Sequence, residues 1–289
     1  MYITSFLHML LVLSLILGLG GCSTLPQRQA VTPSYSHQID TSQTLLAQNI
    51  TALTQQHPDQ TGFHVLYHPR DALISRLHLI ENAEKTLDLQ YYIWENDEVG
   101  ALALAGILKA ADRGVQVRLL LDDNNSKGLE AAYFVLDQHP NIQVRLFNPY
   151  KFRRLRALDI ALNFHRITRR MHNKTFIADQ HIALIGGRNM SNQYYDVGES
   201  FQFADMDVIL IGKAVPDITD SFDEYWNHDY AYPVAQLSHY KAKYLSAESL
   251  KKQLEQHRHH KYTTNYKDVL SADNISIFKF KQNDFFNWV

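Results

Sequence analysis

The sequence predicts an α/β fold, a mostly parallel mixed sheet with helices on both faces. From residue 63 onward, short β-branched and apolar runs alternate with longer segments whose apolar residues recur at helical spacing. Several of the helical segments have ten or more residues, which is the length of a crossover between parallel strands. The chain has 289 residues, of which 45% are hydrophobic, so it can bury a core of this kind.

The first half of the expected domain follows this alternation closely. We expect strands at 63–67, 87–94, 115–121 and 142–147, and helices at 71–80, 99–111 and 129–136. Asp71 is a suitable N-cap for the first of these helices, and Gly114 follows the second where a helix commonly ends. These helices lie between consecutive strands, so they act as the crossovers of the sheet.

Polar side chains stand at the carboxyl ends of two of these strands. Ligands of such sheets bind beyond the carboxyl ends of the strands, so we expect a substrate-lining role for Tyr91, Tyr92, Asp122 and Asn124. Loop and cap chemistry is the alternative for Asp122 and its neighbour Asp123. Two adjacent carboxylates also suggest a metal site, but no His or Cys accompanies them at ligand spacing.

Further elements are expected after residue 170. Strands are predicted at 175–177, 182–185, 203–211 and 275–280, and helices at 215–227 and 246–256, the last capped by Ser246.

The N-terminal residues predict a targeting segment followed by a spacer. Residues 6–21 are apolar apart from His8 and Ser14, which is shorter than the roughly 20 residues that span a bilayer core. We therefore predict a signal peptide over residues 1–21, with an uncleaved interfacial anchor as the alternative. Residues 22–62 are rich in Thr, Ser, Gln and Pro and predict a flexible tether. Cys22 is the one cysteine, so no intramolecular disulfide can form.

Charge is concentrated in one segment of an otherwise balanced chain. The formal net charge is -2, which excludes a globally basic nucleic-acid binder. Residues 151–170 hold seven Lys and Arg residues interleaved with apolar ones, which predicts an amphipathic helix with a cationic face. Anionic lipid headgroups are the expected partner of that face. A nucleic-acid backbone, or a solvated helix face packed on the core, are the alternatives.

The segment Met171 to Asn189 has the strongest chemical signal in the chain. His172 and Lys174 are two residues apart, so on a strand both side chains project from the same face. An imidazole, an ammonium and a carboxamide brought together form a phosphate site in which one member can also attack phosphorus. The complete pattern comprises His172, Lys174, Asp179, Gly186, Gly187 and Asn189.

This pattern matches the HKD motif of the phospholipase D superfamily. Together with QYYIW at 90–94, LLDDN at 120–124 and RRMHNK at 169–174, it resembles the bacterial cardiolipin synthases of the lipoprotein-like type. The resemblance implies a phospholipase D-like domain over residues 63–230, without metal or cofactor. It also implies that His172 is the nucleophile, that Lys174 and Asn189 hold phosphoryl oxygens, and that Asp205 orients the His172 ring. Asp179 belongs to the motif but is expected to brace the fold.

The N-terminus adds a second resemblance, to the bacterial lipobox. Small residues directly before Cys22 imply cleavage before this cysteine and acylation of its thiol. The protein would then be lipid-anchored in the bacterial cell envelope and face the periplasm. Ser23 would favour the outer membrane.

Members of the superfamily combine two HKD motifs in one cleft, whereas this sequence holds one. We therefore expect residues 231–289 to be a polar linker and the start of a missing second repeat. Three arrangements remain open: a truncated product, a homodimer that pairs two copies of His172, or a complex with a separately encoded half.

The resemblance predicts a membrane-anchored phosphatidyltransferase that acts on phospholipids such as phosphatidylglycerol through a phosphohistidine. Nucleic acid is not the expected partner. A homodimeric nuclease or phosphodiesterase, and a non-catalytic lipid-binding lipoprotein, are the alternatives.

Overall fold

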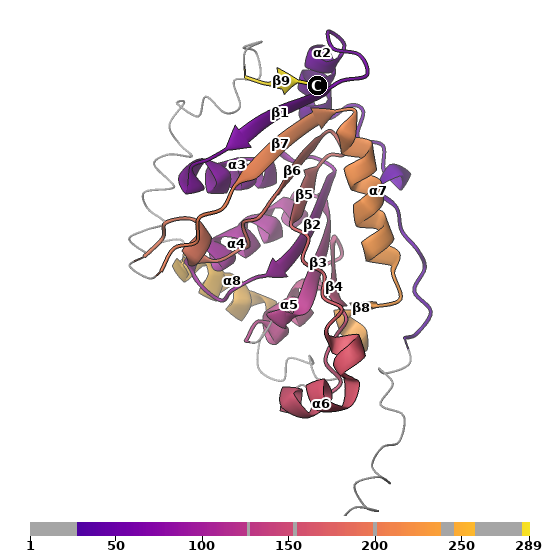
Figure 1. The fold of residues 1–289 in the computed structure, drawn as a ribbon, viewed down its shortest axis with the longest axis vertical. Helices are drawn as coiled ribbons and strands as arrows, with labels where there is room; N and C mark the ends of the chain where they lie inside the picture. Colours follow the sequence, from indigo (N-terminus) through magenta and orange to yellow (C-terminus); the bar gives the residue numbers. More distant parts are fainter. Residues whose placement is uncertain (1–27, 126–127, 153–154, 199–200, 238–245, 258–284) are drawn as a thin grey trace, which may run out of the picture.

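The computed structural model describes residues 28–125, 128–152, 155–198, 201–237, 246–257 and 285–289. In these residues the strands form a sheet in the order β8-β4-β3-β2-β5-β6-β7-β1-β9 (Figure 1). The strands are β1 (Thr61–Leu66), β2 (Thr86–Ile93), β3 (Gln116–Asn125), β4 (Ile142–Phe147), β5 (Thr175–Ala178), β6 (Ile182–Gly186), β7 (Asp207–Gly212), β8 (Ala231–Pro233) and β9 (Asn287–Trp288).

The α/β class with a mixed sheet is confirmed, but the expected predominance of parallel pairs is wrong. Strands β2, β3 and β4 pair in parallel, whereas β5, β6, β7, β1 and β9, and also β8, join their neighbours antiparallel. The reason is connection length. Three residues separate β5 from β6, which permits a hairpin but is far too short for a crossover.

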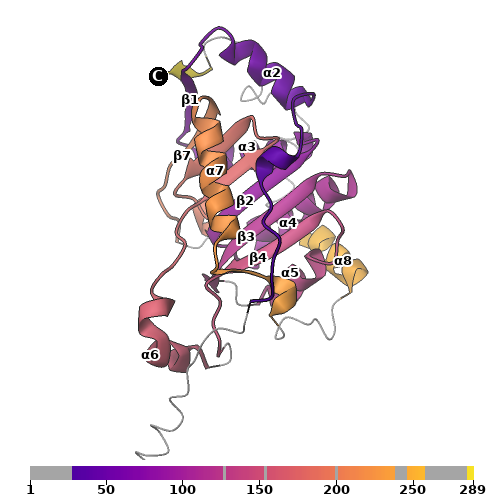
Figure 2. The same cartoon turned by 90° about the vertical axis from the view of Figure 1, so that its right-hand side faces the viewer.

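Helices cover both faces of the sheet, as predicted (Figures 1 and 2). Helices α3, α4, α5 and α8 lie on one face, and α7 with the short 3-10 helix η1 lies on the other. Their bounds are α2 (Leu45–Thr54), α3 (Pro69–Asn82), α4 (Glu98–Asp112), α5 (Glu130–Leu136), α6 (Arg156–Ile167), α7 (Ala214–Asn227), α8 (Ala247–His257), η1 (Ser36–Gln38), η3 (Asn192–Tyr194) and η4 (Val234–Gln236).

Helix α4 illustrates how local sequence sets an element. The Asp97 carboxylate accepts the Gly100 N–H at 3.0 Å, which satisfies one of the free donors at the helix start. Gly114 follows the last turn with φ 100°, a conformation that L side chains rarely adopt. Between these ends the sequence is mostly Ala and Leu, and ten of its residues are buried between the sheet and helices α3 and α8.

Two apolar clusters fill the space between the layers. Along β3, Leu119 belongs to the larger cluster under α3, α4 and α5, and Leu120 belongs to the cluster under α7. Successive side chains of a strand point to opposite faces, so each central strand supplies both clusters. A strand buried on both sides reads as a continuous apolar run, as β3 does.

Residues 28–62 do not form the flexible tether that their composition predicts. Ser36 is buried, and its backbone N–H donates to Asp223 on α7 at 2.9 Å. Helix α2 packs Leu46, Ile50 and Leu53 into the larger core cluster. Composition did not reveal this packing, because much of the segment is held by polar contacts with residues distant in sequence, such as Asp223 and Asn227.

The C-terminal region also departs from the predicted linker. Helix α8 packs on α4 and α5 and buries Leu250 and Leu254. Strand β9 pairs with β1 and thereby extends the sheet, so the folded unit is not limited to 63–230. The strand expected at 275–280 lies outside the described residues.

In the described part of the chain, no helix combines the length and apolarity needed to cross a bilayer. The predicted signal peptide at 1–21 and the acylation site Cys22 lie outside the described residues.

A buried ionic cluster ties the N-terminal segment to the sheet and to α7. The Arg118 guanidinium on β3 contacts Asp88 on β2 at 2.6 Å and Asp223 on α7 at 2.7 Å. Ser36 bridges the two carboxylates, since its hydroxyl lies 3.0 Å from Asp88 and 3.2 Å from Asp223. Charges removed from water are tolerated when each has partners of this kind.

We predict a large loss of stability when the Arg118 guanidinium, the cation of this cluster, is removed. Arg118→Met leaves two carboxylates buried without their partner, so we expect the free energy of unfolding to fall by about 3–5 kcal/mol. Asp229→Ala is the matched control, because the Asp229 side chain is 95% exposed in its pair with Arg28 and its loss should cost about 1 kcal/mol or less. Urea denaturation measures both. Equal midpoints for the two variants would contradict the role of the cluster.

Candidate functional site

The site forms where the chain enters β5. His172 and Lys174 lie in the extended segment just before this strand rather than within it. The His172 side chain is exposed, whereas Lys174 is only 6% exposed. The Lys174 ammonium lies 3.1 Å from Nδ1 and 3.3 Å from Nε2 of His172, and it donates to the His172 carbonyl at 2.6 Å. A solvent-facing imidazole therefore stands directly beside a buried cation.

The surroundings of His172 favour its neutral form. Partial burial and the Lys174 ammonium lower the pKa of the imidazole below its usual 6.5, and the Asp205 carboxylate opposes them. Burial also lowers the pKa of Lys174, again opposed by Asp205. A neutral imidazole keeps a nitrogen lone pair at pH 7, which a nucleophile requires.

Tyr92 and Asn124 form the wall next to the imidazole. The rings of Tyr92 and His172 are 4.7 Å apart, and the Lys174 ammonium lies 5.5 Å from the Tyr92 ring centre. Asn124 donates to the Tyr92 hydroxyl at 3.1 Å and accepts from the Tyr150 hydroxyl at 2.6 Å. Tyr92 thus lies beside the His172 ring, and Asn124 is connected to it through Tyr92.

Tyr91 does not line the site. Its side chain is 1% exposed, and its hydroxyl accepts a hydrogen bond from Arg76 at 3.0 Å within the core. It precedes Tyr92 on β2, so the alternation of strand side chains directs it to the opposite face. The prediction that both tyrosines line one cleft is therefore wrong.

Asp122 is a bracing residue rather than a lining one. The carboxylate is 1% exposed and accepts from the Met171 N–H at 2.9 Å, from the Arg170 guanidinium at 3.0 Å and from the Asn124 N–H at 2.8 Å. Its predicted contact with substrate is therefore wrong. Asp122 instead fixes the residue that directly precedes His172.

The glycine pair makes room for two carboxylates. A Cβ at Gly187 would collide with the Asp205 carboxyl group, and one at Gly186 would collide with Asp207. Asp207 is fully buried and pairs with Arg76 at 2.9 Å. The lack of side chains at the glycine pair thus permits the close approach of these two acidic side chains.

Asn189 and Asp179 both bind the main chain. Asn189 is 2% exposed; its carbonyl oxygen accepts from the Ile93 N–H at 2.9 Å and its amide donates to the Tyr194 hydroxyl at 2.9 Å. The Asp179 carboxylate accepts from three consecutive N–H groups at residues 84–86, between 2.8 and 3.0 Å. Asp179 thus holds the start of β2. The phosphate contact of Asn189 and the hydrogen bond from His172 to Asp205 stay predictions.

Sequence reasoning missed two residues that position the site. The Arg170 guanidinium binds Asp122 and also donates to the Asn148 carbonyl at 2.9 Å. Tyr150 holds Asn124, and the Arg156 guanidinium lies 4.8 Å from the Tyr150 ring centre. The available signal was the position of Arg170, two residues before the nucleophile. Nothing in the sequence pointed to Tyr150.

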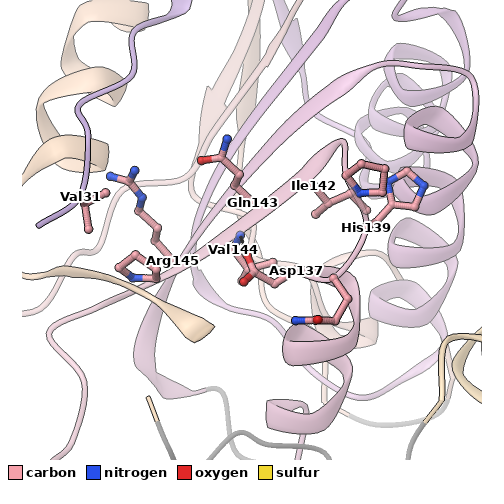
Figure 3. A pocket seen from close by; sticks show the side chains of 10 residues that line it. Val31, Asp137, His139, Ile142, Gln143, Val144 and Arg145 are labelled. Carbon is pink, nitrogen blue, oxygen red and sulfur yellow. Dashed lines mark hydrogen bonds between the residues drawn. The ribbon is translucent and has the colours of Figure 1, made fainter. Parts of the chain in front are cut away.

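A separate pocket of about 370 Å³ lies on the β4–β8 side of the sheet (Figure 3). Arg145 lines it and stacks over the Trp226 ring at 4.0 Å. Burial, with Arg28 and Arg118 nearby, lowers the pKa of Arg145 to about 10. None of the predicted site residues lines this pocket, so the phosphate chemistry is not assigned to it.

Comparison with known proteins points to one family. Residues 77–230 match the family model described as "Cardiolipin synthase, PLD-like domain". Cardiolipin synthase C of Escherichia coli is 48% identical over 192 residues, which cover 66% of this chain and 41% of that protein. The major cardiolipin synthase of Bacillus subtilis is 32% identical over 170 residues, covering 58% of this chain and 34% of that protein.

Among solved structures, phosphatidylserine synthase of Haemophilus influenzae superposes with a TM-score of 0.48 at 15% identity, covering 72% of this chain and 47% of that one. The chain spans about half the length of the curated relatives that it matches, or less.

The two charges beside His172 predict opposite effects on its titration. Lys174→Met removes a cation that lowers the pKa of the imidazole, so this pKa should rise. Asp205→Asn removes an anion that raises it, so the pKa should fall. NMR titration of the His172 ring proton, assigned by its loss in His172→Gln, measures both. Shifts in the same direction would contradict the electrostatic description of the site.

Proposed function

Because the chain belongs to the family of cardiolipin synthase phospholipase D-like domains, we propose that it takes part in phosphatidyl transfer through His172. The observation that supports this most directly is the exposed, neutral imidazole beside the Lys174 ammonium. In the proposed first step a His172 ring nitrogen attacks the phosphorus of a phospholipid. A nitrogen–phosphorus bond forms, and the bond from phosphorus to the headgroup oxygen breaks.

Lys174 stabilises the charge that develops in this step. The ammonium lies 3.1 Å and 3.3 Å from the two ring nitrogens, so it can donate to a non-bridging oxygen of a phosphorus that either nitrogen attacks. Its contact with the His172 carbonyl holds it in place before substrate arrives. We assign Asn189 to the same oxygens through its amide group, and Asp205 to orienting the imidazole.

The reaction also requires a second acid–base group. The departing alkoxide needs a proton, and the hydroxyl group of the acceptor must lose one before it attacks phosphorus and releases His172. We propose that a second set of the same residues supplies this group, carried by further sequence or by a second copy of the chain. The support is that the chain spans about half the length of its relatives, or less.

The proposed substrate is phosphatidylglycerol, which would serve as both phosphatidyl donor and acceptor alcohol. Transfer from one molecule to the free headgroup hydroxyl of another yields cardiolipin and glycerol. The support is the family match and the names of the relatives. We further propose attachment to the bacterial cell envelope through an acylated Cys22, with the domain facing the periplasm.

Removal of the nucleophile should abolish transfer. With phosphatidylglycerol vesicles and lipid products measured by mass spectrometry, His172→Ala should lower the rate by about 10³-fold or more. Asn173→Ala is the matched control, because this exposed neighbour lies outside the site and its loss should leave the rate unchanged.

A His172→Ala rate equal to that of the control would contradict catalysis by this residue. Cleavage of plasmid DNA without any phospholipid turnover would instead favour the nuclease alternative.

A further inference from the structure

Helix α6 presents its polar residues to the protein and its apolar residues to the outside. Four polar residues recur at intervals of three and four, at positions 156, 159, 163 and 166, and so form one stripe. Asp159 in this stripe is fully buried and accepts from the Lys151 N–H at 2.6 Å and from Asn163 at 2.7 Å. The Arg166 guanidinium contacts Asp159 at 3.3 Å and donates to Asn148 at 2.6 Å.

Part of the cationic face predicted for this segment turns toward the protein, where Arg156 and Arg166 act as internal braces. Arg169 is exposed, and residues 153–154 lie outside the described residues. The sequence did not reveal this orientation, because the arginines bind residues such as Asn148, at the end of β4, whose role the sequence does not show.

The outer surface of α6 is apolar. We define the apolar surface of α6 as the five large exposed side chains Leu155, Leu158, Ile160, Leu162 and Phe164, with exposures of 61%, 43%, 39%, 53% and 65%. The helix also exposes His165 and two alanines, but its one acidic residue, Asp159, is buried, so no carboxylate interrupts this surface. Large exposed apolar residues gathered on one helix indicate an interaction site.

Helix α6 also stands away from the rest of the domain. In both views it projects beyond the end of the sheet at which β3 and β4 terminate, which is also the end where the site lies (Figures 1 and 2). A convex helix that projects from the domain can insert into a lipid bilayer, because fluid acyl chains pack around it. A folded protein partner would need a groove of matching shape. Exposed Arg169 lies at the base of the helix, where an anionic headgroup would meet it.

Short contacts join the base of α6 to the nucleophile. The Arg156 guanidinium donates to the Asn124 carbonyl at 2.7 Å, and Asn124 holds Tyr92 beside His172. On the other side, Arg170 follows the helix and binds Asp122, which holds the main chain just before His172. These contacts connect α6 to the residues on both sides of the imidazole.

We propose that α6 inserts its apolar surface into the acyl region of a phospholipid bilayer and so places His172 at the level of the lipid phosphates. The proposal rests on the proposed phosphatidyl transfer for its substrate, but the insertion itself is independent of turnover. In this proposal lipid covers the apolar surface of α6. The test below distinguishes this from coverage by a second copy of the chain.

A fluorescent depth probe on the full chain tests this directly. In a Cys22→Ser background, Leu162→Cys carries an environment-sensitive fluorophore, and Tyr67→Cys carries the same label as a matched control. Tyr67 is 69% exposed but lies at the end of β1, away from α6. With vesicles of phosphatidylglycerol and brominated phosphatidylcholine, emission at 162 should shift to the blue and be quenched several-fold more strongly than at 67.

Two results would overturn the proposal. The first is a probe at position 162, and also one at 158, that stays in water when vesicles are present. The second is a blue shift without vesicles that grows with protein concentration, which would mean that another copy of the chain covers α6. Insertion without phosphatidyl transfer would contradict the proposed function alone, and transfer without insertion would contradict the insertion alone.

Discussion

The buried carboxylate of Asp122 is the contact on which the arrangement of the site depends. It lies at the end of β3 and receives the Met171 N–H and the Arg170 guanidinium, which together set how the chain enters β5. The residue after Met171 is His172, so one carboxylate holds the main chain next to His172 against the parallel half of the sheet. Gly187 leaves room for Asp205, which comes from the antiparallel half of the sheet. The charge of the Asp205 carboxylate raises the pKa of the same imidazole. The two halves of the mixed sheet meet at this point.

Polar contacts of the same kind connect helix α6 at the surface to this site. Its polar stripe is bound internally, and its large apolar side chains are exposed among the described residues. Hydrogen bonds run from Arg156 to Asn124 and from Asn124 to Tyr92, whose ring lies beside His172, so the helix and the imidazole are connected at one end of the sheet.

Local sequence patterns predicted the chemistry of the site better than they predicted the topology of the sheet. The spacing of the motif identified His172 and Lys174, and alternation along the chain located most strands and helices. The hairpin between β5 and β6 was also detectable, because three residues cannot form a crossover, but repeated helices in the first half favoured parallel pairing throughout. Alternation along the strand was enough to place Tyr91 and Tyr92 on opposite faces, although not to tell which of them lies beside His172. The role of Asp122 and the orientation of α6 were not accessible, since each depends on a partner distant in sequence, namely Met171 and Asn148.

The most direct measurement of the central claim is chemical capture of the intermediate. A preparation that forms cardiolipin is stopped with a denaturing detergent at neutral pH during turnover, and its peptides are mapped by mass spectrometry. We predict a phosphatidyl group on the peptide that contains His172, lost on brief acid treatment because nitrogen–phosphorus bonds are acid-labile. A phosphatidyl group on another residue, or product formation with His172 unmodified throughout, would contradict the mechanism.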